Sequence, residues 1–291
     1  MNAVLKNSVA ICRIPIRRFV VYPKARDEQG ENMAKLVFGL QQERLMKRAI
    51  AAIAIKGFAL LLAAFGTGGR AMALDAAAAY PKMAPIEEYL MDRDAEIALA
   101  RSAAPDSISH DATVMVLARH GYETAVKGKN GWVCLVDRGW SGMFDYPEFW
   151  SPKIRGAACL NPPIARSFLP YDYKRTKLIL AGHSKEEVIA ATKAAIDKKE
   201  LPVLERGICY MMSKSAYLGD EGDHDMPHLM FYEAAKDGTA WGANLTNSPV
   251  MGVSYWSMSA AAYPQLKDFP PIFVYLVPVD KWSDGTPAPP M

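Results

Sequence analysis

Long apolar stretches are missing from this 291-residue sequence. A transmembrane helix needs about 20 consecutive, mostly apolar residues. The main apolar run, residues 57–65 (GFALLLAAF), is much shorter, and Lys56 stands directly before it. The sequence therefore predicts no stable membrane span in the processed protein.

Basic charge is scarce over most of the chain, although the formal net charge is +3. Of the 34 basic and 31 acidic residues, 12 basic and only 4 acidic ones precede Leu74. The rest of the chain therefore has 22 basic and 27 acidic residues, a net charge of −5. Nucleic acids and anionic membranes attract basic surfaces. The charge distribution thus argues against both as partners.

Cysteine is rare as well, with four residues in the whole chain. Cys12 lies near the start, and the remaining three allow at most one disulfide among themselves. We expect this bond between Cys134 and Cys159, because both flank an aromatic loop. Cys209 is then a buried small apolar residue in a strand at 208–212. The absence of any disulfide remains an alternative, since geometry decides whether one forms.

Residues 46–73 have the three parts of a secretory signal peptide. A basic start precedes the apolar run, and a glycine-rich stretch then ends in Ala-Met-Ala. The small residues Ala71 and Ala73 suit signal peptidase, so cleavage is predicted between Ala73 and Leu74. We therefore expect a periplasmic or secreted protein, with a permanent membrane anchor as the alternative.

Residues 1–45 do not fit in front of such a signal. They contain no apolar run of comparable length, and their charges are mixed. We interpret them as an upstream or mis-started extension, with translation starting at Met46. This interpretation predicts a purine-rich ribosome-binding sequence in the codons for Gln42 and Glu43.

Residues 74–291 mix helical and strand patterns, which predicts one α+β domain with a mainly antiparallel sheet. Two principal helices are expected, over 85–104 and 184–199. The second begins with the S-x-x-E spacing of a capping box. An Asn-Gly turn between two strand patterns predicts a hairpin. The expected strands are 113–118, 122–126, 132–136, 177–181, 208–212, 229–232 and 272–279.

The densest polar cluster lies at residues 220–228 (DEGDHDMPH). Histidine and carboxylate side chains are suitable ligands for zinc or another divalent ion. The candidate metal ligands are His224, His228 and Asp223, with Asp220 or Asp225 available to assist. A solvated acidic turn between two strands is the alternative, and the sequence identifies no other catalytic residue.

Two further patterns have a chemical and a structural interpretation. Residues 182–184 (GHS) are similar to the nucleophile elbow of α/β-hydrolases, but Glu186 replaces its final glycine. Helix capping by the serine is the favoured interpretation. The loop with Phe144, Tyr146 and Trp150 can cover a sheet face or line an apolar pocket for a small molecule.

Five strings of this sequence together resemble a family of uncharacterised exported bacterial proteins. The resemblance covers nearly all of the chain after the signal peptide, implies export, and assigns no activity or catalytic residue. We therefore predict an exported soluble protein with a binding or structural role. A metal-dependent or His/carboxylate hydrolytic enzyme centred on 220–228 is the alternative. The strings lie at 96–105, 121–136, 201–214, 227–232 and 277–286.

Overall fold

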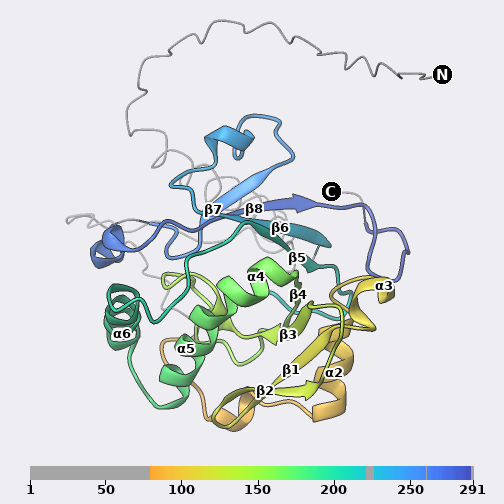
Figure 1. The fold of residues 1–291 in the computed structure, drawn as a ribbon, viewed down its shortest axis with the longest axis horizontal. Helices are drawn as coiled ribbons and strands as arrows, with labels where there is room; N and C mark the ends of the chain where they lie inside the picture. The colour runs from red at the N-terminus through yellow and green to blue at the C-terminus, as the bar shows by residue number, and fades with distance from the viewer. Residues whose placement is uncertain (1–78, 221–225, 260, 290–291) are drawn as a thin grey trace, which may run out of the picture. The chain divides into compact units, whose positions relative to one another are not determined.

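An eight-stranded sheet organises the part of the chain that the computed structural model describes, residues 79–220, 226–259 and 261–289. These residues belong to one compact unit, Ala73–Met291. The strand order is β2-β1-β3-β4-β5-β6-β8-β7, and every neighbouring pair except β1 and β3 is antiparallel (Figure 1). The predicted α+β class is confirmed. The predicted signal peptide 46–73, its cleavage site and the extension 1–45 lie outside the described residues.

The strands are β1 (Thr113–Ala118), β2 (Gly121–Val126), β3 (Val133–Asp137), β4 (Gly156–Leu160), β5 (Gly207–Met211), β6 (His228–Glu233), β7 (Met251–Ser254) and β8 (Phe273–Pro278). The α-helices are α2 (Arg93–Arg101), α3 (Asp106–Ser109), α4 (Pro162–Ser167), α5 (Leu169–Leu180) and α6 (Lys185–Asp197). Short 3-10 helices are η1 (Ile86–Glu88), η2 (Gly139–Ser141), η4 (Thr239–Trp241) and η5 (Pro264–Asp268).

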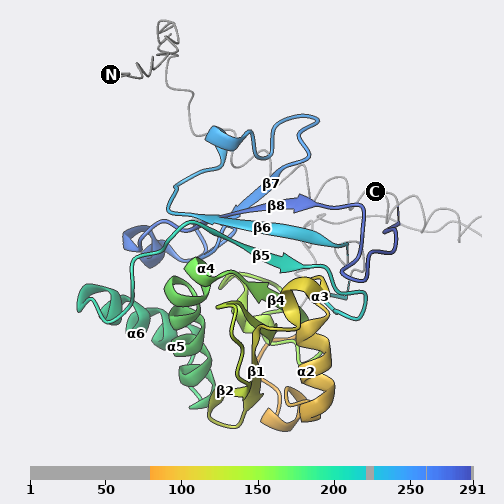
Figure 2. The same cartoon turned by 45° about the vertical axis from the view of Figure 1, so that its right-hand side comes forward.

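Helices cover both faces of the first half of the sheet. Figure 2 shows α2 on one side of strands β1 to β4, and α4 and α5 on the other. Side chains alternate across a strand, so Cys134 and Val136 of β3 pack in the α2 cluster, whereas Leu135 packs in the larger core on the opposite face. Burial on both faces explains why β3 and β4 are apolar without alternation.

The disulfide Cys134–Cys159 forms as predicted. The two cysteines are directly opposite in the antiparallel β3–β4 ladder, and both are fully buried against α2. The loop that they flank connects these two strands, which is why they meet. Cys209 of β5 is free and buried, again as predicted.

The helix predicted at 184–199 is confirmed as α6. Ser184 accepts a hydrogen bond from the Glu187 backbone N–H, and the Glu187 carboxylate accepts one from the Ser184 N–H. This reciprocal pair is the predicted capping box. The helix predicted at 85–104 is shorter, because Asp92 caps a new start and α2 begins only at Arg93.

The strand predicted at 177–181 is wrong, because its first four residues are the end of α5. A short apolar run looks alike in a buried strand and in a buried helix. Pro162, Pro163 and Pro170 occupy the first turns of α4 and α5, where the missing N–H costs nothing.

The predicted hairpin between 122–126 and 132–136 is also wrong. Strand β2 pairs with β1, and β3 lies on the other side of β1, parallel to it. The intervening segment crosses the start of β1 so closely that a Cβ on Gly128 would lie 2.2 Å from the Thr113 nitrogen. The Asn130 side chain donates to the Ile108 carbonyl and so ties this crossing to the α3 region. A turn signal alone does not reveal a third strand between its two arms.

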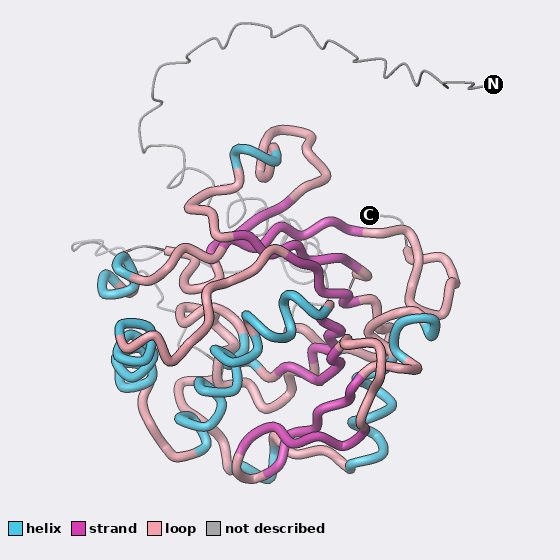
Figure 3. Tube along the Cα trace, in the orientation of Figure 1, coloured by secondary structure: helices cyan, strands magenta, loops and turns pink. Residues whose placement is uncertain are grey.

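Beyond β6 the chain leaves the sheet and returns as the edge strand β7. Figure 3 shows this excursion, which contains η4, at the top of the molecule. Its apolar residues Ala243 and Val250 pack with Phe273 and Tyr275 of β8, on the outer face of the second half of the sheet. The inner face of the same strands borders an apolar cavity.

Candidate functional site

An inner cavity of about 420 Å³ lies against strands β6, β7 and β8. In the β6–β8 ladder, Met230 is opposite Leu276 and Tyr232 is opposite Val274, so these four side chains share one face of the sheet. The register with β7 adds Met251 and Val253 to that face. The regular alternation of the strands thus builds an apolar floor.

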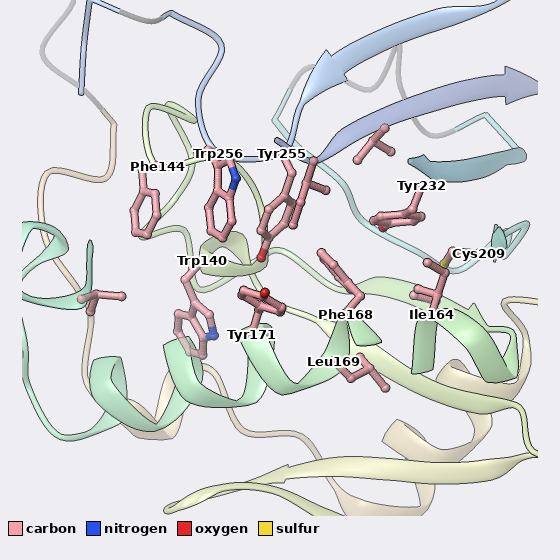
Figure 4. Close-up of a cluster of buried hydrophobic side chains, with 14 of the residues drawn as sticks. Trp140, Phe144, Ile164, Phe168, Leu169, Tyr171, Cys209, Tyr232, Tyr255 and Trp256 are labelled. Atoms are coloured by element: carbon pink, nitrogen blue, oxygen red, sulfur yellow. The ribbon is translucent and has the colours of Figure 1, made fainter. Parts of the chain in front are cut away.

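The cavity is closed on its other sides by chain segments that are distant in sequence. The β3–β4 loop contributes Tyr146, the α4–α5 junction contributes Phe168, and the chain after β7 contributes Tyr255. The Phe168 ring centroid lies 4.7 Å from that of Tyr232 and 4.8 Å from that of Tyr255, and Figure 4 shows these three rings near one another. The remaining lining residues are Asp137, Arg138, Gly139, Ser141, Gly142, Met143, Ile154, Gly156, Met211, Leu218, Met226 and His228.

Methionines and aromatic rings dominate this wall. Five methionines line it, and methionine is flexible and polarisable, so it adapts to varied apolar partners. Met251 of the edge strand β7 belongs to the wall and is also 42% exposed. A volume of this size suits a small molecule.

Polar groups gather at one end of the cavity, where β3 ends. Asp137 and Ser141 belong to the wall, and Asp172 of α5 lies behind them, 1% exposed. The Ser141 hydroxyl lies near the carboxyls of Asp137 and Asp172 and lowers the pKa of each, but among the described residues neither this hydroxyl nor the Asp172 carboxylate makes a hydrogen bond of good geometry. This end therefore offers hydrogen-bonding groups next to an apolar chamber.

The two carboxyl groups at this end disfavour each other's ionisation. Burial raises the pKa of Asp137 well above its usual range, and the nearby Asp172 raises it further, against the opposing effects of Ser141 and Arg138. Burial likewise raises the pKa of Asp172, opposed chiefly by Arg175. Two close carboxyls in a poorly solvated site share protons rather than both ionising.

Arg138 directs three of its five N–H groups to the protein itself. Its Nη2 donates to Glu96 over 2.9 Å, its Nε donates to the Tyr89 carbonyl, and its Nη1 donates to the Val136 carbonyl. The side chains of Arg138 and Glu96 are 0% and 1% exposed, and Glu96 also accepts the Leu117 backbone N–H. This buried pair joins α2 to the ends of β1 and β3, beneath the polar end of the cavity.

Arg175 fixes the loop that covers the cavity. Its Nη1 donates to the carbonyls of Trp140 and Gly142, and its guanidinium lies 4.3 Å from the ring centroid of Phe144 and 4.8 Å from that of Tyr255. Stacking of a guanidinium between aromatic rings is favourable, and more so away from water. The aromatic loop is therefore held from α5.

The predicted metal site can be located only in part. Asp223 and His224 lie outside the described residues. His228 is in β6, 5% exposed, borders the cavity, and donates from Nδ1 to the Met226 carbonyl over 2.8 Å. Within the described parts of the chain, no group of three or more His, Cys, Asp or Glu residues could hold a metal ion.

The aromatic loop and residues 182–184 carried the other sequence hypotheses. Of the three aromatic residues proposed for a pocket, Tyr146 lines the cavity, Phe144 is buried in the core, and Trp150 borders a separate outer cleft. The elbow interpretation of 182–184 fails, since a helix precedes this segment instead of a strand. Ser184 caps α6, as predicted.

The acidic residues at the polar end were not predicted. Asp137 follows the apolar strand residues directly, in the string LVDRGW, and a charged pair at the end of a buried strand was the available signal. Asp172 lies in a helix that the sequence did not reveal, so its proximity to Asp137 had no local indication.

Across the described segments, every helix is too short or too polar to cross a bilayer. Neither a family model, nor a curated protein, nor a solved structure matches this chain.

Proposed function

We propose that this protein binds a small, mainly apolar molecule in the cavity between strands β6–β8 and the β3–β4 loop. The observation that carries the proposal is the wall itself: five methionines and four aromatic rings surround about 420 Å³, with polar groups confined largely to one end. Apolar pockets with a few polar groups are the common form of small-molecule sites.

The position of the cavity supports binding rather than simple imperfect packing. Core voids in proteins are few and small, whereas this one is large and has the exposed Met251 in its wall. The groups around it are firmly fixed, by the buried Arg138–Glu96 pair and by Arg175. A fixed chamber loses little conformational entropy when a ligand enters.

We also propose that the protein acts outside the cytoplasm. The basic, apolar and small-residue parts of residues 46–73 support export, and the Cys134–Cys159 disulfide suits an oxidising compartment. Metal-dependent hydrolysis at 220–228 stays a prediction of the sequence.

A blocking variant tests the binding proposal. Leu276→Trp places an indole in the cavity, whereas the matched Val277→Trp places it on the opposite face of the same strand. The full-length chain is titrated with the neutral fluorophore prodan, whose emission reports a dry environment, and then with 1-octanol as competitor. We expect the wild type and Val277→Trp to bind prodan and release it to octanol, and Leu276→Trp to lose binding.

Two results would overturn the proposal. One is a wild-type chain that binds neither compound; the other is equal binding by both tryptophan variants. Thermal unfolding of each variant verifies that a loss of binding is not a loss of folding.

A further inference from the structure

Carboxyl groups outnumber buried guanidiniums at the polar end of the cavity. The nearly fully buried ionisable groups in this region are Glu96, Asp172, Arg138 and Arg175, two carboxylates and two guanidiniums. Asp137 adds a third carboxyl, and it is the one on the cavity wall. Arg155 lies nearby, but it is partly exposed and donates to the backbone carbonyls of three other residues.

An anionic ligand would find little to pair with on this wall. Each of the three nitrogens of Arg138 already donates to Glu96 or to a carbonyl group, and its side chain is 0% exposed. A carboxylate placed at this end would also face the Asp137 side chain. The arrangement therefore disfavours fatty-acid-like ligands at the polar end.

A cationic group meets the opposite conditions. The Asp137 carboxylate can pair with it, and the Ser141 hydroxyl, which is buried at the same end, can accept an N–H. The rings of Tyr146, Phe168 and Tyr255 line the chamber, and aromatic faces attract cations. A bound ammonium would take the place of the proton that Asp137 and Asp172 otherwise share.

We propose that the natural ligand is an apolar molecule with one basic nitrogen, whose ammonium group pairs with Asp137. This inference rests on the proposed binding function and names the ligand class. At a pH where Asp137 holds a proton in the empty cavity, binding of the ammonium releases that proton to solvent. The ligand stays charged, because alkylamines titrate far above neutrality.

The proposal predicts a specific dependence on pH. Asp137 interacts with Ser141 and Arg138 beside it and with Asp172 from α5, and His228 belongs to the same cavity wall. The other ionisable groups that feel its charge are Tyr122 from β2, Tyr173 from α5, Cys209 from β5, Tyr232 from β6 and Tyr255 after β7. Burial raises the pKa of Asp137. Below that raised pKa, amine affinity should fall about tenfold for each pH unit, because each binding event must displace one proton.

Calorimetric titration of the full-length chain with octylamine, 1-octanol and octanoate tests the proposal. These compounds share a chain and differ at the polar end. We expect octylamine to bind more than about tenfold tighter than octanol at pH 8, as suits a charge-assisted contact, and octanoate to bind most weakly. Asp137→Asn should abolish the octylamine preference and its pH dependence while octanol binding persists.

Control variants and outcomes separate this proposal from the binding function. Asp94→Asn, an exposed α2 carboxylate, should match the wild type. Octanol binding without an octylamine preference would overturn the amine proposal and leave the binding function intact. Failure of all three compounds to bind would overturn the binding function. A pH dependence that survives in Asp137→Asn and disappears in His228→Gln would also refute the assignment of the proton to Asp137.

Discussion

Replacing Glu96 by alanine should be among the most destabilising single changes in this protein. The substitution leaves the Arg138 guanidinium, whose side chain is 0% exposed, without its carboxylate partner. It also removes the acceptor of the buried Leu117 N–H. Breaking a buried ion pair from one side costs about 3–5 kcal/mol, and an orphaned buried N–H costs about 1–3 kcal/mol. The two costs overlap, because one side chain accepts both hydrogen bonds. We therefore expect a total at the lower end of their sum, about 4 kcal/mol.

Urea unfolding, followed by tryptophan fluorescence, measures this loss as a change in the free energy of unfolding. Glu96→Gln keeps an acceptor for both donors and loses only the charge, so we expect about 1–2 kcal/mol. Glu123→Ala is the matched control. It breaks the Arg93–Glu123 pair, which is about half-exposed on both sides, and should cost less than about 1 kcal/mol.

The outcome that refutes this reasoning is a cost below about 1.5 kcal/mol for Glu96→Ala, or equal costs for Glu96→Ala and Glu123→Ala. Either result would mean that the buried pair is solvated in solution. The polar end of the cavity would then lack the rigid structural support that the proposed function requires.

Three further predictions concern other parts of the fold. Reduction of the Cys134–Cys159 disulfide, which spans 25 residues, should lower the free energy of unfolding by about 3 kcal/mol, measured by urea unfolding with and without reductant; an unchanged midpoint would contradict this. Ser184→Ala should cost about 1 kcal/mol through loss of the capping box, and an effect near zero in the same assay would show that the cap is dispensable. Because Asp137 has a raised pKa in the folded state, its favourable contribution to stability is full below about pH 4, the unfolded pKa, and declines as pH rises toward the folded pKa. Asp137→Asn should therefore flatten the decline of the urea midpoint between pH 4 and 8. Identical pH profiles of the midpoint in the wild type and in Asp137→Asn would refute the raised pKa of Asp137.

The sequence predicts those parts of the fold that depend on interactions between residues close together in the chain. The capping box at Ser184 needs only residues three positions apart, and it was found. The α+β class followed from the mixture of patterns along the chain. The position of β1 between β2 and β3 was missed, because the turn at Gly131 is present whether or not a third strand separates its arms.

The site was harder to predict because its parts come from distant segments. Asp137, Asp172 and Leu276 belong to β3, α5 and β8, and no spacing in the sequence relates them. Of the three aromatic loop residues proposed to line a pocket, only Tyr146 lines the cavity. Phe144 was assigned to the same pocket, but it packs against Arg175, a contact that depends on an α5 helix that the sequence did not indicate.

Methyl NMR of the full-length chain with ¹³C-labelled methionine tests the central claim, ligand entry into the cavity, most directly. On addition of 1-octanol, we predict saturable shifts of the methyl signals that line the cavity and none elsewhere. The cavity set is Met143, Met211, Met226, Met230 and Met251, and the reference set is Met91, Met115 and Met258. Shifts confined to the reference set, or no saturable shift at all, would contradict the account.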